Sequence, residues 1–99
     1  MRGDYPDLNR LVKLSETYNS SFEEGVVTVV DDSHGVGSFG RTGRGTIEET
    51  NAAGIDIITS TLGKALGVNG GYIVTKRSIV KYLREKFLLI FVVTLSAIY

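Results

Sequence analysis

The sequence predicts a single α/β domain in which helices flank a mostly parallel sheet. The chain has 99 residues, which is within the usual size range of one domain. Residues 26–30 read VVTVV, an almost unbroken β-branched run that is typical of a strand covered on both faces of a parallel sheet. Glycine-rich stretches follow this run and the next apolar run, where loops at strand ends are expected.

The remaining elements follow from the spacing of their apolar residues, which is three and four positions in helices and short and continuous in strands. In chain order, the predicted elements are a helix at residues 8–18, a short helix at 46–49, strands at 55–59 and 72–74, and a helix at 78–86. Lys81 and Glu85 lie one helical turn apart, so we expect a weak surface ion pair between them.

Composition excludes several classes of function. The 11 basic and 11 acidic residues give a net charge of zero, so neither a general nucleic-acid binder nor an anionic-membrane binder is expected. The absence of cysteine excludes disulfides, thiolate metal sites and a cysteine nucleophile, and it is compatible with a cytoplasmic protein. A single histidine with scattered carboxylates predicts no metal site.

The end of the chain differs from the rest. Residues 87–99 read FLLIFVVTLSAIY, in which only Thr94 and Ser96 are polar. As a helix this segment would reach roughly 20 Å, short of the roughly 30 Å hydrocarbon core, so no membrane span is expected. We interpret residues 1–86 as one unit and residues 87–99 as a divergent hydrophobic tail that is able to bind a partner or to aggregate.

Two motifs in the first glycine-rich stretch are weak. Residues 35–40, GVGSFG, match G-x-G-x-x-G, but a dinucleotide site needs these glycines to open a helix, and RTGRG follows instead. Asp32, Ser33 and His34 are the residue types of a hydrolase triad, yet sequence neighbours do not readily converge as nucleophile, base and orienting group.

Four polar residues lie at the predicted strand ends. Asp31 closes the first strand, where it either meets a positively charged ligand group or braces the loop. His34, taken alone, is more typical of a hydrogen-bonded structural histidine. Thr61 and Lys64 follow the second strand. An amine among apolar and glycine neighbours is suited to Schiff-base chemistry, and the alternative is an ordinary solvated lysine.

Together these residues carry a family resemblance. The segments VVDDSHGVGSFGRTGRG and DIITSTLGKALGVNGGYIV resemble the α-oxoamine synthases, which are pyridoxal-phosphate (PLP) enzymes of fold type I. The glycine C-acetyltransferase (2-amino-3-ketobutyrate CoA ligase) branch is the most similar, followed by 8-amino-7-oxononanoate synthase. The resemblance implies that the chain is a central fragment of the large, PLP-binding domain, inactive or weakly active alone.

The resemblance also implies roles for the four strand-end residues. Lys64 would bind PLP covalently and serve as the catalytic base, and Asp31 would pair with the pyridinium nitrogen. His34 would hydrogen-bond the phenolic oxygen of the ring and tune it in catalysis, and Thr61 would contact the phosphate.

The implied reaction condenses glycine with acetyl-CoA to 2-amino-3-oxobutanoate in a homodimer. One alternative is condensation of alanine with a longer acyl thioester. A second is a non-catalytic α/β remnant.

Overall fold

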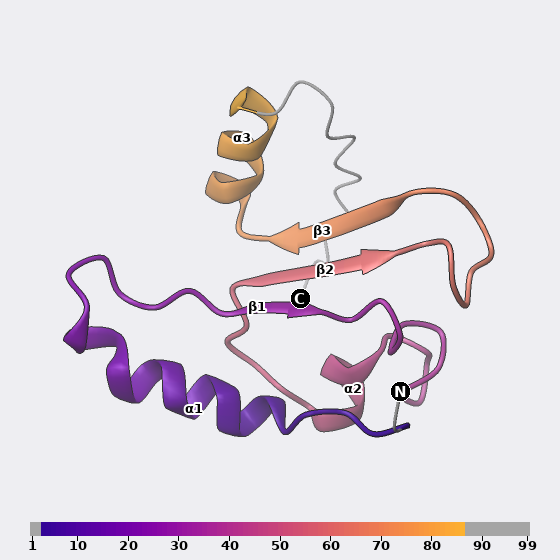
Figure 1. The fold of residues 1–99 in the computed structure, drawn as a ribbon, viewed down its shortest axis with the longest axis horizontal. Coiled ribbons are helices and arrows are strands. Elements are labelled where there is room, and N and C mark those ends of the chain that lie inside the picture. The colour runs from indigo at the N-terminus through magenta and orange to yellow at the C-terminus, as the bar shows by residue number, and fades with distance from the viewer. Residues whose placement is uncertain (1–2, 87–99) are drawn as a thin grey trace.

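The computed structural model describes residues 3–86, which form a small α/β unit with a three-stranded sheet in the order β1-β2-β3 (Figure 1). The predicted α/β class is confirmed. The strands are β1 (Val29–Asp31), β2 (Ile57–Thr61) and β3 (Gly71–Thr75). The helices are α1 (Leu8–Tyr18), the 3-10 turn η1 (Asn19–Ser21), α2 (Thr46–Thr50) and α3 (Arg77–Lys86). The predicted tail at residues 87–99 lies outside the described residues.

The sheet is mixed. β1 pairs parallel to β2, whereas β2 pairs antiparallel to β3. A parallel return would need a crossover of about a dozen residues or more, and the loop at residues 62–70 is too short to provide one. α1 and α2 lie on the β1 side of the sheet and α3 lies beyond β3 (Figure 1).

The helices agree well with the prediction. α1 begins where Asp7 caps it, since the Asp7 carboxylate accepts a hydrogen bond from Arg10 N at 3.0 Å. In α3, Lys81 Nζ and Glu85 Oε1 are 3.9 Å apart, so the predicted ion pair is present on the exposed surface.

The first strand is shorter than predicted. Regular pairing begins only at Val29, and two of the backbone N–H groups before it bond to side chains. Val26 N donates to Asn19 Oδ1 at 2.9 Å, and Thr28 N donates to Asp56 Oδ2 at 3.0 Å.

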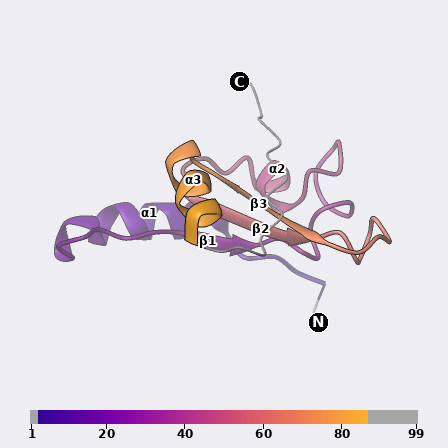
Figure 2. The same ribbon diagram turned by 90° about the horizontal axis from the view of Figure 1, so that it is seen from above.

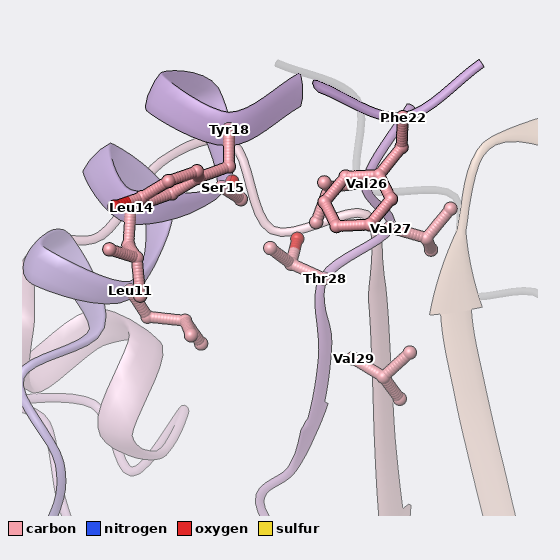
Figure 3. A pocket seen from close by; sticks show the side chains of 9 residues that line it. All are labelled: Leu11, Leu14, Ser15, Tyr18, Phe22, Val26, Val27, Thr28 and Val29. Atoms are coloured by element: carbon pink, nitrogen blue, oxygen red, sulfur yellow. The ribbon is translucent and has the colours of Figure 1, made fainter. Parts of the chain in front are cut away.

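Few apolar side chains are buried. The buried apolar residues of the described region are Leu8, Val12, Val30 and Val80. Val29 is 58% exposed, so the expectation that β1 is covered on both faces is not met within residues 3–86. A groove of about 530 Å³ lies between α1 and the chain leading into β1. Figure 3 shows Leu14 and Tyr18 of α1 on one side of it and Phe22 and residues 26–29 on the other.

Candidate functional site

The carboxyl ends of β1 and β2 lie together. The two strands are parallel, with Asp31 in register with Thr59, so the glycine-rich loops that follow them leave from the same end of the sheet. Figure 1 and the view from above in Figure 2 both show the two loops at this end. Ligands of open α/β sheets bind at such an end, which makes it the candidate site.

The loop after β1 is organised by a buried carboxylate. Asp32 is 3% exposed and accepts hydrogen bonds from Thr46 N at 2.8 Å and Thr46 Oγ1 at 2.6 Å. A Cβ at Gly35 or at Gly45 would collide with the Asp32 carboxylate. These glycines therefore make room for an internal aspartate, and helix α2 begins only at Thr46, so the glycine motif does not open a helix as a dinucleotide site requires.

Two acidic residues of α2 hold the outer part of the same loop. Glu48 Oε2 accepts from Thr42 N and from Arg44 N, both at 3.1 Å. Glu49 Oε2 accepts from Gly40 N at 3.0 Å. No role was predicted for these glutamates, because their partners lie outside the helix that carries them.

Asp31 stands exposed at the edge of the site. Its Oδ1 accepts a hydrogen bond from Ser33 N at 2.9 Å. Hydrogen bonds from the side chain and then the backbone of Ser33 lower the pKa of Asp31, outweighing desolvation, and the positive charges of Lys64 and His34 lower it further. Lys64 and His34 are thus within electrostatic range of Asp31, and the carboxylate remains ionised at neutral pH.

Lys64 lies in the loop after β2, at the start of a turn closed by Gly67 N donating to Lys64 O at 3.1 Å. This loop touches the first one: a Cβ on Gly37 would lie 2.6 Å from Ala65 Cβ. Gly37 has φ +81°, a conformation that favours glycine, so the contact and the backbone both require it. His34 and Lys64 are both exposed.

Thr61 ends β2 and closes the second loop. Its hydroxyl donates to Gly70 O at 3.2 Å and accepts from Gly63 N at 3.1 Å. Its backbone N–H donates to Ser33 Oγ at 3.0 Å, so Thr61 and the β1 loop are directly joined. Ser33 was predicted only as part of a weak triad motif, and its bond to Thr61, 28 residues away, was not predicted. The Asp-x-Ser spacing is the pattern of an aspartate that accepts from the N–H two residues on, so it signals the bond from Ser33 N to Asp31 but not the bond between Ser33 and Thr61.

Two further observations bear on the site. The described residues contain no group of three or more His, Asp or Glu side chains placed to hold a metal ion. Within residues 3–86, no helix combines the length and the apolar composition that crossing a bilayer requires.

Comparisons with known proteins agree with the resemblance inferred from the sequence. The family model described as aminotransferase class I and II matches residues 1–93. The chain is 42% identical over 87 residues to a putative 8-amino-7-oxononanoate synthase of Acetivibrio thermocellus, covering 87% of this chain and 21% of that protein. It is 40% identical over 88 residues to 2-amino-3-ketobutyrate coenzyme A ligase of Escherichia coli K12, with the same coverage of 87% and 21%.

A solved structure is also similar. Serine palmitoyltransferase of Sphingomonas wittichii matches with a TM-score of 0.71 and 33% identity, over 87% of this chain and 20% of that chain. The chain thus spans about a fifth of the length of the relatives it matches.

Proposed function

The chain belongs to the aminotransferase class I and II family, and from this premise we propose that it forms one wall of the PLP site of an α-oxoamine synthase. The observation that carries the proposal is that Asp31, His34 and Lys64 lie on the segments at the carboxyl ends of two parallel strands, where Lys64 and His34 help to lower the pKa of Asp31. A cofactor that needs an anion at one end and an amine at the other would find both in this place.

The residues present fit this cofactor. The lowered pKa of Asp31, caused mainly by Ser33, keeps an anion available for a protonated pyridine nitrogen. Lys64 is exposed on a short turn, so its amine is accessible to an aldehyde, and the exposed His34 would supply a hydrogen-bond donor for the ring oxygen. The hydroxyl of Thr61 donates to Gly70 O, so contact with a phosphate would require it to exchange that partner.

The chemistry that PLP supplies when bound is an electron sink for charge released at the α-carbon of an amino acid. Lys64 would hold the cofactor and, once displaced by the substrate amine, take the α-proton. Asp31 would keep the ring nitrogen protonated, and His34 would tune the ring through a hydrogen bond. Because Asp31, His34 and Lys64 are all exposed in residues 3–86, other polypeptide must complete the pocket and exclude water.

The proposed reaction is the condensation of glycine with acetyl-CoA to give 2-amino-3-oxobutanoate, by a homodimer in the cytoplasm. The 40% identity to 2-amino-3-ketobutyrate coenzyme A ligase supports it. The 42% identity to a putative 8-amino-7-oxononanoate synthase supports a second candidate, condensation of alanine with a longer acyl thioester.

The cofactor part of the proposal is tested by locating the lysine that PLP modifies. PLP is added to the full chain, the adduct is reduced with borohydride, and the pyridoxyl group is mapped by mass spectrometry. We expect an imine absorbance band and modification at Lys64, both lost in Lys64→Ala and kept in Lys13→Ala, a matched change at an exposed lysine of α1. Equal modification of all lysines, with an unchanged spectrum in Lys64→Ala, would contradict the proposal.

A further inference from the structure

One hydroxyl joins the ends of β1 and β2. Ser33 Oγ accepts a hydrogen bond from Thr61 N at 3.0 Å, while Ser33 N donates to Asp31 Oδ1 at 2.9 Å. Resting on the proposed function, we propose that Ser33 is a positioning residue, which fixes the Asp31 carboxylate relative to the end of β2, from which the Lys64 loop starts. Ser33 would not itself touch the reacting atoms.

The hydroxyl is needed because the backbone ladder stops at this point. Asp32 N still donates to Thr59 O at 2.9 Å, but Asp32 O turns away from the sheet to accept from Gly35 N and Val36 N at 3.0 and 3.1 Å. Ser33 Oγ therefore provides the acceptor for Thr61 N that the departing backbone no longer supplies. An alanine at position 33 would leave this N–H without that partner.

The same residue restrains a side chain that packing does not hold. Asp31 is exposed, so burial does not select one orientation of its carboxylate. The charged groups that act on it are Lys64 and His34, both on loops. The hydroxyl of Ser33 and then its backbone N–H lower the pKa of Asp31 more than either charge does, and only the hydroxyl is lost in an alanine variant. A site that must present a carboxylate in one position needs such a supporting hydrogen bond.

The experiment reads the Asp31 carboxyl directly by NMR, in the full chain without cofactor. In Ser33→Ala we expect the titration midpoint of Asp31 to shift upward and the Thr61 amide proton to exchange faster. Ser33→Thr, which keeps the hydroxyl, should restore both values. Ser38→Ala, an exposed serine of the same loop, should change neither. Asp56, at the opposite end of β2, serves as an internal reference for the folded state.

A cofactor readout complements the titration. Ser33→Ala keeps the backbone N–H bond to Asp31 and loses the bond from the hydroxyl. Loss of that one hydrogen bond to a charged group is expected to weaken PLP binding about tenfold, with recovery in Ser33→Thr. If Ser33→Ala unfolds, Ser33→Cys takes its place, because a thiol keeps the side-chain size and bonds only weakly.

An unchanged Asp31 midpoint and unchanged Thr61 exchange in a folded variant would overturn the role of Ser33. Failure of PLP to modify Lys64 in the unaltered chain would instead overturn the proposed function, and the titration separates the two because it needs no cofactor.

Discussion

The two ends of the β1–β2 pair each carry an aspartate, and the aspartates are used differently. At the amino end of β2, Asp56 Oδ2 accepts from Thr28 N and Thr28 Oγ1, both at 3.0 Å, and its Oδ1 lies 3.4 Å from Lys76 Nζ. At the carboxyl end of β1, Asp31 bonds only to nearby Ser33 among the described residues and stays exposed. Asp56 joins the segments that lead into β1 and β2, whereas the charge of Asp31 is exposed at the surface.

A second comparison sets the polar carboxyl end of the β1–β2 pair against the apolar groove beside α1. The carboxyl end has a dense set of internal hydrogen bonds around Asp32 and Glu48, and it carries exposed charged groups. The groove between α1 and residues 22–29 instead exposes apolar side chains such as Phe22 and Val27, each 60% exposed (Figure 3). Hydrogen bonds within residues 3–86 therefore satisfy the buried polar side chains at the carboxyl end, whereas these residues do not bury the apolar side chains of the groove.

The largest expected effect comes from removing the buried carboxylate that shapes the carboxyl end. Asp32→Ala leaves Thr46 N and Thr46 Oγ1 without their acceptors in a buried place, which should lower the free energy of unfolding by about 3 kcal/mol. Asp32→Asn should cost less, because an amide oxygen still accepts. Urea denaturation measures both, with Glu23→Ala, at an exposed position, as the control expected within about 0.5 kcal/mol. If Asp32→Ala lowered the free energy of unfolding no more than the control, Asp32 would not be a residue that stabilises the loop.

Sequence reasoning succeeded where the signal is local. The 8–18 helix has its cap and its apolar spacing within one segment, and both glycine-rich loops are visible as composition. The shortened β1 could not be predicted, because the acceptor for Thr28 N is Asp56, 28 residues away in sequence. For the same reason the sequence could not separate a structural Asp56 from an exposed Asp31.

A smaller effect on stability is expected at Asp56, at the amino end of β2, when the pH is lowered. The hydrogen bonds from the backbone and then the hydroxyl of Thr28 lower the pKa of Asp56 in the folded chain. A depressed folded pKa gives stability that is present above the unfolded pKa and is lost as the pH falls through the folded value, here from about pH 5 downward. Thr28→Val removes a hydroxyl that donates to Asp56 Oδ2 at 3.0 Å and accepts from Asp56 N at 2.9 Å. The loss of both bonds should cost about 2 kcal/mol at neutral pH, with a shallower loss of stability in acid.

The measurement is the urea midpoint as a function of pH, which tests whether Asp56, unlike the exposed Asp31, stabilises the fold. Lys76→Ala is the control, since the Lys76 side chain is 74% exposed and its ion pair should contribute less than about 0.5 kcal/mol. If Thr28→Val kept the full acid dependence of the parent chain, the strand clamp at Asp56 would not be the origin of that dependence.

The smallest effect on stability is expected at the residue with the greatest proposed effect on the cofactor. Asp31→Asn keeps an oxygen that accepts from Ser33 N and lies at an exposed position, so the free energy of unfolding should change by no more than about 0.5 kcal/mol. The loss of the anion should nevertheless weaken PLP binding, because an amide cannot pair with a protonated ring nitrogen. Asp56→Asn reverses the pattern, with a loss of stability and no direct effect on the cofactor. Urea and PLP titrations of both variants test this comparison. Equal changes in the free energy of unfolding and in PLP affinity in the two variants would mean that the two strand ends are not functionally distinct.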